Sequence, residues 1–317
     1  MGTVVRQRLY AVHAEHCADL VANELGRLEQ LWSAYKPESE ICQITQHAGR
    51  RMVQVHAETA FILAAAKALH RLTGGAFDVT VAPLLRLWRS AARRMAPPDA
   101  NEIAEARTLV GCDDLLLDPQ LAASSLKQPY LLDRSAPVAM LRRARQGLDL
   151  GGIGKGYAAD RCRHLLIESG VRHAWLDLGG QVLLLGSRPD GSPWRVGIQD
   201  PSGARGKWLA RLNLQDTAIA TAGGYERGFE VNGQRYSHIL DPRTGEPANS
   251  GLASATIVGH STLRCDVLAT ACVVLGLDAA WALVASCKGL EALFVINSGE
   301  VIHTPGLTGC IAHNERA

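Results

Sequence analysis

The spacing of apolar side chains in the N-terminal quarter of the chain predicts one strand followed by two helices. The segment TVVRQRLYAV is typical of an opening strand. In the segment CADLVANELGRLEQLWSAY, apolar residues recur at helical spacing and predict an amphipathic helix: Leu20, Leu25, Leu28 and Trp32. A second helix, rich in Ala and Leu, is predicted over residues 57–73 and ends at a glycine pair.

The second half of the chain is dominated by short apolar segments separated by turns that contain Gly, Pro or Asp. A helix, GYAADRCRHLLIESG, precedes them and is closed by Gly170. The short segments predict antiparallel strands: AWLDL, QVLLLG, WRVGIQD, WLARLNL, TAIATA and YSHILD. Two more helices follow, STLRCDVLATACVVLG with Ser261 as its N-cap and then LDAAWALVASCKG, before a closing hairpin in ALFVINSGEVIH.

This grouping of helices and strands predicts the fold class. Strict alternation of strand and helix would favour a doubly wound parallel sheet, whereas grouped elements favour an α+β fold. We therefore expect mostly antiparallel sheets flanked by helices. The length of 317 residues fits one domain over residues 1–317, and a division into two subdomains, about 1–147 and 148–317, stays open. Residues 89–147 show no clear period.

Composition narrows the class of protein. A hydrophobic content of 47% with 20% charged residues is typical of a globular chain with a sizeable core. The net charge of +2 and the aromatic content of 5% argue against a nucleic-acid partner. The sequence has no uninterrupted apolar stretch of about 18 residues, so no membrane span is predicted. The eight cysteines are never in CxxC spacing, which argues against a zinc ribbon and favours buried thiols.

The beginning of the chain bears on its location in the cell. The segment MGTVVRQRLYAVHAEHC has no basic-then-apolar secretory pattern, and no apolar run precedes Cys17 as a lipoprotein signal would require. We therefore expect a cytoplasmic protein, exported only if an upstream signal is missing from this sequence. The oligomeric state is left open.

The glycine-rich segment LDLGGIGKGYAADR, residues 148–161, is a candidate phosphate loop. It fits neither the Walker A motif nor the GxGxxG dinucleotide fingerprint. One interpretation has Asp149 accepting hydrogen bonds from a ligand and Lys155 facing a phosphate, with the helix that starts near Gly156 directing N–H groups at the same anion. The other is a glycine-rich turn before a helix, with a solvated lysine and a partly buried carboxylate that has no explanation.

A second candidate site lies in CDVLATACV, where Asp266 and Thr270 are four residues apart. On a helix this spacing places both side chains on one face. A carboxylate and a hydroxyl form an all-oxygen pair that suits Mg²⁺, which completes its coordination with carbonyls, water and phosphate. The alternative is a polar position on an otherwise apolar helix. We favour the cation, because a charged Asp among apolar residues needs a partner.

The third candidate is RYSHILDPRTGEP, a predicted strand followed by a turn. Pro242 presets φ for the turn and Gly245 supplies a positive φ. His238 is predicted on the strand just before the turn, with Asp241 and Arg243 close by in the sequence. A lone strand histidine is more often a packed or exposed bystander than a catalyst, but functional residues gather at strand ends. Both interpretations stay open at this point.

Nine segments, in order along nearly the whole chain, resemble the ApbE family of FAD:protein FMN transferases. They are MGT (1–3), LWSAYKPESEICQI (31–44), GGAFDVTVAPLLRLW (74–88), LDLGGIGKGYAAD (148–160), WLDLGGQVLLLG (175–186), WRVGIQDP (194–201), AIATAGGYER (218–227), HILDPRTGEP (238–247) and CDVLATACVVLG (265–276). The resemblance implies an α+β fold and a Mg²⁺-dependent reaction. In that reaction the FAD pyrophosphate is split, FMN is attached to a Ser or Thr of a target flavoprotein, and AMP leaves.

The resemblance also implies roles for particular residues. Those that would border the flavin or its linker are Met1, Tyr35, Ala76, Phe77 and Asp78. Those that would bind FAD are Asp149 and Lys155, with the backbone of Ile239 and Leu240 contacting the flavin dinucleotide. The implied metal ligands are the Gly152 carbonyl, Asp266 and Thr270, and the implied catalytic residue is His238, which would assist the acceptor hydroxyl.

Two departures from the family pattern keep other functions open. Many relatives carry a further carboxylate or serine where this chain has Ala269, so metal affinity is expected to be weaker. The common TSG is TAG at residues 221–223. Alternative functions are an FAD pyrophosphatase, with water in place of the target hydroxyl, and an FAD-binding or flavin-delivery protein without turnover.

Overall fold

The computed structural model describes residues 3–118 and 137–313, and their packing separates into two units. The first unit comprises residues 1–26, 155–226 and 249–317, and the second comprises residues 27–154 and 227–248. The chain therefore leaves each unit and returns to it. Helix α1 (Ala14–Trp32) begins in the first unit and ends in the second.

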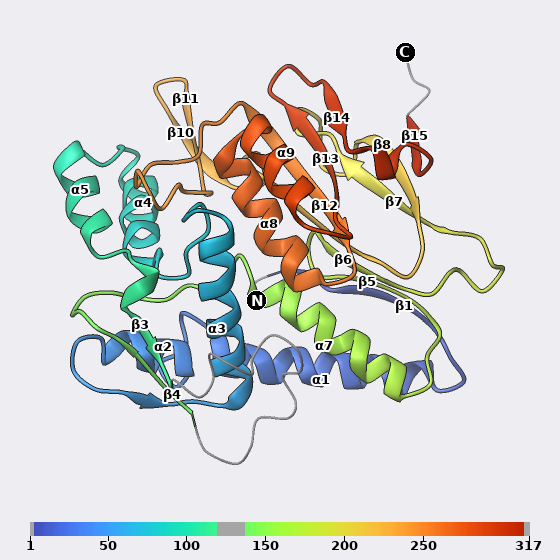
Figure 1. Ribbon diagram of the computed structural model, residues 1–317, viewed down its shortest axis with the longest axis horizontal. Helices are drawn as coiled ribbons and strands as arrows, with labels where there is room; N and C mark the ends of the chain where they lie inside the picture. The colour runs from blue at the N-terminus through green and yellow to red at the C-terminus, as the bar shows by residue number, and fades with distance from the viewer. Residues whose placement is uncertain (1–2, 119–136, 314–317) are drawn as a thin grey trace. The chain divides into compact units, whose positions relative to one another are not determined.

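The first unit is built on a seven-stranded sheet whose strand order is β1-β5-β6-β9-β12-β13-β14 (Figure 1). The bounds of its strands are β1 Arg6–Tyr10, β5 His173–Asp177, β6 Gln181–Leu185, β9 Ala218–Gly223, β12 Leu252–Gly259, β13 Glu291–Ile296 and β14 Val301–His303. Every pairing in this sheet is antiparallel. Strand β12 lies between β9 and β13 and is buried at seven of its eight residues.

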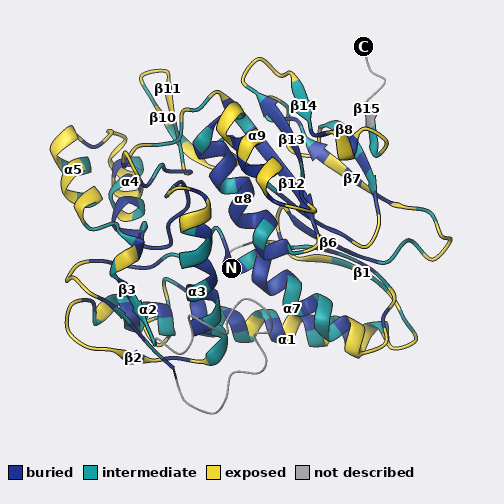
Figure 2. Cartoon of the chain, viewed as in Figure 1, coloured by how far each residue is buried: buried dark blue, intermediate teal, exposed yellow. Residues whose placement is uncertain are grey.

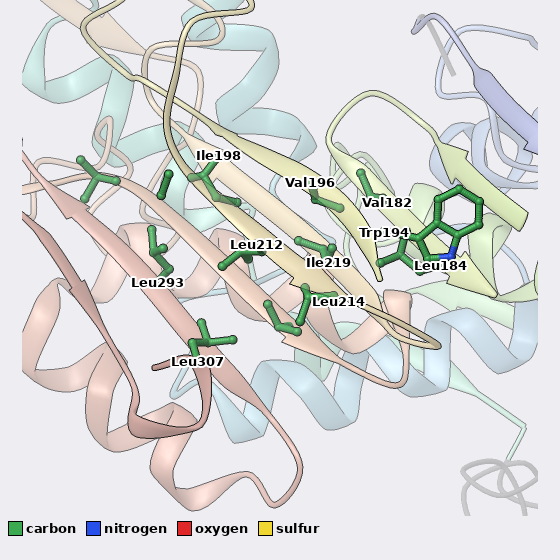
Figure 3. Packing of buried hydrophobic residues seen from close by; sticks show 13 residues of the cluster. Val182, Leu184, Trp194, Val196, Ile198, Leu212, Leu214, Ile219, Leu293 and Leu307 are labelled. Atoms are coloured by element: carbon green, nitrogen blue, oxygen red, sulfur yellow. The ribbon is translucent and has the colours of Figure 1, made fainter. Parts of the chain in front are cut away.

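A three-stranded antiparallel sheet of order β15-β8-β7 packs on the larger sheet. Its strands are β7 Trp194–Gln199, β8 Trp208–Leu214 and β15 Ile311–His313, and a short 3₁₀ helix, η2 (Pro305–Leu307), precedes β15. Figure 3 shows the apolar cluster between the two sheets, in which Val196 and Leu212 from the smaller sheet meet Ile219 and Leu293 from the larger one. Burial of these side chains stabilises the packing of the two sheets.

Three helices complete the first unit: α7 Gly154–Glu168, α8 Thr262–Leu275 and α9 Leu277–Ser286. Helix α8 is apolar nearly all round and is buried along most of its length, as the dark blue ribbon in Figure 2 shows. It packs against strands β9 and β12 of the seven-stranded sheet and also contacts helix α9. The predicted N-cap is confirmed, because the Ser261 side chain accepts a hydrogen bond from the Arg264 N–H.

The second unit is mainly helical and carries two small antiparallel sheets. Its helices are α2 Glu40–Gln46, α3 Ala57–Leu72, α4 Ala82–Arg94 and α5 Ala100–Thr108, with a 3₁₀ turn, η1, at Cys112–Asp114. One sheet has the order β2-β4-β3 (Val53–Gln54, Val138–Leu141 and Leu115–Leu117), and the other is the hairpin of β10 Gly228–Val231 and β11 Gln234–Ser237. Leu84, Trp88 and Ala91 of α4 form a small core with Leu240.

The predicted fold class is confirmed, because every strand pairing in the described residues is antiparallel and helices accompany the sheets. The expected opening strand, the two N-terminal helices and the closing hairpin are all present. One detail is wrong: strand β11 ends at Ser237, so His238 follows the strand instead of lying on it. Among the described helices, none is both long and apolar enough to cross a membrane.

Candidate active site

The glycine-rich segment ends in the start of α7, and one of its glycines sets how closely two helices approach. A Cβ atom at Gly156 would lie 2.6 Å from the Thr262 carbonyl oxygen and 2.7 Å from the Leu263 Cα. Any side chain there would therefore push α7 away from the first turn of α8. The missing Cβ allows the backbone of α7 to lie directly against the helix that carries the predicted metal ligands.

Asp160, one helical turn further along α7, caps the N-terminus of α8. Its carboxylate accepts hydrogen bonds from the Thr262 N–H at 2.7 Å, the Leu263 N–H at 3.1 Å and the Ser261 hydroxyl at 2.9 Å. These donors include backbone groups that a helix start leaves without partners. Burial raises the pKa of Asp160, and the same hydrogen bonds oppose that rise. The acid therefore fixes α8 against α7.

Asp266 lies in the middle of α8 with a buried carboxylate that two donors hold in place. One oxygen accepts from the Gly156 N–H at 3.0 Å and the other from the Gln181 side-chain amide at 2.8 Å. Burial raises the pKa of Asp266, whereas the positive charge of Lys155 and these two hydrogen bonds lower it. The glycine-rich segment and α8 therefore meet at this carboxylate, where Gly156 and Asp266 are 110 residues apart in sequence.

The groups around Asp266 fit a hard divalent cation. Thr270 is on the same face of α8, where its hydroxyl donates to the Asp266 carbonyl at 3.2 Å and keeps its oxygen lone pairs for a ligand. The side-chain oxygen of Gln181 is buried and has no hydrogen-bond partner in the described part of the chain. A carboxylate, a hydroxyl and an unsatisfied amide oxygen are the ligand types that Mg²⁺ prefers. The residues present therefore suit the metal that the sequence predicted.

In the second unit, Asp149 lies at the start of the glycine turn and is tied to α4. One carboxylate oxygen accepts from the Gly151 N–H at 2.8 Å, and the other lies 3.4 Å from the Arg89 guanidinium. The same guanidinium lies over the ring of Tyr35, 5.5 Å from its centroid. Tyr35 is 73% exposed, so a flat aromatic surface stands beside a fixed ion pair. Such a ring can stack on a flavin or an adenine.

The predicted flavin residues Ala76, Phe77 and Asp78 are all buried. The carboxylate of Asp78 accepts from the backbone N–H of Thr80 at 2.7 Å and from its hydroxyl at 2.6 Å, and it lies 3.3 Å from the His70 ring. Its described contacts are therefore with groups of the same unit.

The predicted turn around DPRTGEP is present and is anchored on α4. Gly245 has a φ of +85°, and its carbonyl accepts from the Trp88 indole N–H at 2.8 Å. Arg243 contacts both oxygens of Asp241, at 2.9 Å and 2.8 Å, which stiffens the turn. The turn therefore forms a rigid end for the segment that carries His238.

His238 is exposed, whereas Ile239 and Leu240 beside it are buried. Its Nδ1 lies 3.0 Å from the Arg227 carbonyl oxygen. A carbonyl only accepts hydrogen bonds, so this contact assigns the proton of the neutral ring to Nδ1 and makes Nε2 the basic nitrogen. The Ile239 carbonyl accepts from the Ala248 N–H at 2.8 Å, and Leu240 forms a bridge with Pro247. The backbone contacts of Ile239 and Leu240 therefore fix the chain directly after His238.

Comparison with known proteins decides the family. A model of the ApbE family matches residues 1–294. The chain belongs to the ApbE family. It is 31% identical to an FAD:protein FMN transferase from Klebsiella pneumoniae, over 95% of this chain and 89% of that protein. It is 32% identical to one from Treponema pallidum, over 97% of this chain and 85% of that protein.

Solved structures of the ApbE family agree with this assignment. The ApbE protein of Thermotoga maritima superimposes with a TM-score of 0.83 at 32% identity, covering 96% of this chain and 94% of that one. The flavin transferase ApbE from Vibrio cholerae gives a TM-score of 0.83 at 26% identity, covering 98% of this chain and 96% of that one. The fold predicted from the resemblance is therefore that of known ApbE structures.

Within each unit, this ApbE chain brings together some of the predicted residues. In the first unit, the charge of Lys155 acts on the Asp266 carboxylate, and Thr270 contacts the backbone of Asp266. Tyr35 and Asp149 meet in the second unit through Arg89, and the backbone of Gly152 belongs to that unit as well. Met1 lies outside the described residues.

Sequence reasoning missed two residues that contact the predicted site. Gln181 stands in the WLDLGGQ segment, but no pattern links it to Asp266, which is 85 residues away. Arg89 lies on α4 among other arginines, and nothing in their spacing distinguishes the one that reaches Asp149. Both assignments depend on long-range contacts of the fold.

Proposed function

We propose that this chain is an FAD:protein FMN transferase that uses Mg²⁺, attaches FMN to a Ser or Thr of an acceptor protein and releases AMP. The observation that carries the proposal is the buried Asp266 carboxylate, with the Thr270 hydroxyl on the same helix face, the unpartnered Gln181 oxygen and the charge of Lys155, in a chain of the ApbE family. The names of its relatives, FAD:protein FMN transferases at 31% and 32% identity, support the same reaction.

The reaction replaces a phosphoanhydride bond with a phosphate ester bond. The acceptor hydroxyl oxygen bonds to the phosphorus of the FMN half of FAD, and the bond from that phosphorus to the bridging oxygen breaks. The bridging oxygen leaves with AMP, and the hydroxyl proton goes to a base. No oxidant or reductant is required, and no covalent enzyme intermediate is needed.

The chain supplies groups for each part of this step. Asp266 and Thr270 would hold Mg²⁺, which when bound neutralises charge on the diphosphate oxygens. Lys155 would add a second positive charge on the same oxygens. Nε2 of His238 would take the hydroxyl proton, since the Arg227 carbonyl holds the ring proton on Nδ1. The exposed ring of Tyr35 would stack on the flavin.

The decisive experiment is covalent labelling of an acceptor protein. Incubation with FAD, Mg²⁺ and a candidate acceptor should give an acceptor band that keeps flavin fluorescence after denaturing electrophoresis. Asp266→Ala should abolish labelling, and His238→Ala should slow it by about 10²–10⁴-fold, the usual contribution of a general base. Asp278→Ala, an exposed acid on α9, is the matched control and should label at the wild-type rate. Equal labelling by Asp266→Ala would overturn the metal assignment.

The two alternatives give different products in the same assay. An FAD pyrophosphatase would release FMN and AMP at full rate with no acceptor present. A flavin-binding or delivery protein would retain FAD and form no AMP under any condition. Quantifying AMP with and without acceptor therefore separates the three functions.

A further inference from the structure

The second unit contains a cluster of three side chains of types that can bind a metal ion, none of them part of the Asp266 group. His70 is in the last turn of α3, Asp78 follows in the next loop, and Cys112 is the first residue of η1. One ligand atom from each side chain lies within 4.8 Å of the others. His70 is half-buried, and Asp78 and Cys112 are buried. Three segments of the chain thus direct a nitrogen, an oxygen and a sulfur at one point.

The carboxylate of Asp78 is oriented before any ligand arrives. One oxygen accepts from both the N–H and the hydroxyl of Thr80, and the other lies 3.3 Å from Nδ1 of His70. Nδ1 of His70 lies 2.9 Å from the Phe77 carbonyl oxygen, which can only accept a hydrogen bond, so Nε2 is the nitrogen left for a metal. Thr80 is held in turn, since its hydroxyl oxygen accepts from the Gly111 N–H at 2.8 Å. Gly111 directly precedes Cys112, so one hydrogen-bond chain links the backbone beside the sulfur to the Asp78 carboxylate. Metal sites commonly have such outer partners, which fix the ligands in place.

The turn that carries the sulfur is also fixed from outside. The Lys67 ammonium donates to the Cys112 carbonyl at 3.1 Å and to the Leu115 carbonyl. Lys67 lies one turn before His70 on α3, so the same helix that presents the imidazole also fixes the backbone of η1. The hydrogen bonds of Lys67 therefore fix the position of Cys112 relative to the helix that carries His70.

We propose that His70, Asp78 and Cys112 form a zinc-binding site. In tetrahedral zinc sites the metal lies about 2.0–2.3 Å from nitrogen, oxygen and sulfur ligands, which places the ligands about 3.3–3.8 Å apart. Because the three atoms lie within 4.8 Å of one another, each pair needs to close in by at most about 1.5 Å to reach that geometry. A neutral imidazole, a carboxylate and a thiolate balance the charge of Zn²⁺, which suits a buried position. The mixed donor set favours zinc over Mg²⁺ or Ca²⁺, which take oxygen ligands.

The bound ion would join the end of α3, the Ala76–Asp78 loop and η1. The first two segments are neighbours in sequence, whereas His70 and Cys112 are separated by 42 positions in the chain numbering. The ion would act as a structural cross-link, because the three ligands come together only in the folded chain and metal binding therefore adds to the free energy of folding. This role does not depend on the proposed flavin reaction.

Cobalt substitution of the purified full-length protein tests the proposal. Protein stripped with a chelator is titrated with Co²⁺ alone, whose bond to a thiolate gives a charge-transfer band in the near ultraviolet. The expected result is a band that saturates at one equivalent and is reversed by Zn²⁺. The Asp266 group cannot produce this band, because its ligands are oxygens. Metal analysis of protein grown with zinc should show about one zinc per chain.

Matched variants make the test specific. Cys112→Ser, which nearly preserves volume, should abolish the band. Thr80→Val should weaken Co²⁺ binding by about 10–100-fold, as loss of an outer partner usually does. Cys162→Ser removes another buried free thiol and should leave the band unchanged. A band that survives in Cys112→Ser, or wild-type protein that gives no band at one equivalent, would overturn the proposal. Circular dichroism of each variant verifies that the chain is folded.

Discussion

At the scale of single residues, Asp266 shows a conflict between folding and binding. Its carboxylate is buried, and burial raises its pKa even though Lys155, the Gly156 N–H and Gln181 oppose the rise. An ionised acid is therefore costly to the metal-free fold. The same charge is what a divalent cation requires. The side-chain oxygen of Gln181 is buried without a hydrogen-bond partner in the described residues, so it is a further group that a ligand could satisfy.

We expect Asp266→Asn to stabilise the metal-free protein while removing its response to Mg²⁺. The Gln181 amide can rotate so that its unpartnered oxygen accepts from the new Asn amide, and the Asn oxygen can still accept from Gly156. Relief of the buried charge should raise the melting temperature at neutral pH by roughly 2–4 °C, the effect of about 1 kcal/mol. Calorimetry with chelator and with Mg²⁺ measures both effects. A variant that still gains stability from Mg²⁺ would contradict the assignment.

The sign of the pH dependence provides an independent check. An acid with a raised pKa in the fold binds more protons folded than unfolded, so the free energy of unfolding falls as pH rises from the ordinary value of 3.8 through the raised value. Asp266→Asn lacks this contribution. The stability difference between variant and wild type should therefore be small at the acidic end of that window and increase with pH.

At the scale of elements, the contact between α7 and α8 depends on the absence of a single atom. Gly156 allows the two helices to touch, and Asp160 and Ser261 then complete the start of α8. The glycine motif thus has a packing role independent of any phosphate. This explains why the segment matches neither common phosphate-loop template, since its spacing also serves a helix pair.

Gly156→Ala should destabilise the protein by about 1–3 kcal/mol, because the added methyl group meets backbone atoms that cannot rotate away. Gly26→Ala is the matched control: Gly26 lies inside α1 with nothing within 4 Å of its Cβ position. Alanine there should stabilise the helix by up to about 1 kcal/mol. Urea midpoints of the two variants should therefore shift in opposite directions. Shifts in the same direction would show that the helix contact tolerates a side chain.

At the scale of the whole molecule, most elements predicted from apolar spacing are present, but several others were not predicted, among them α2 and the strongly amphipathic α4. Strand β12 was not predicted, because a central strand buried on both faces shows no alternation of polar and apolar residues. The β10–β11 hairpin was also missed, although Asn232-Gly233 is a strong hairpin signal. Both turn residues have positive φ, 51° and 77°, as that signal requires.

The candidate site was predictable only where its residues lie close together in sequence. Asp266 and Thr270 share a helix face, so their spacing of four was sufficient. The contacts of Asp266 with Gly156 and Gln181 depend on how α7 and β6 pack against α8, and no local pattern contains that information. The same holds for Arg89 with Asp149 and for the His70, Asp78 and Cys112 group, whose members come from separate segments.

The cysteines give a prediction that tests the packing of the whole chain. All eight are free thiols; six are buried, and Cys42 and Cys310 are partly exposed. Burial raises the pKa of Cys112, Cys162 and Cys272 to about 12, far above the ~8.5 of a free thiol. Because the thiolate is the reactive form, a disulfide reagent at about pH 8 should label at most two thiols quickly in native, metal-free protein.

The remaining six thiols should react only after denaturant is added, which a spectrophotometric count before and after unfolding measures. Mass spectrometry of the native reaction should place the label on Cys42 and Cys310. Cys42 should be the slower of the two, since its thiol contacts the Ser33 carbonyl at 3.5 Å. Rapid native labelling of Cys162 or Cys272 would mean that these thiols are open to solvent. Because Cys272 lies on α8, its labelling would also contradict the burial on which the Asp266 site depends.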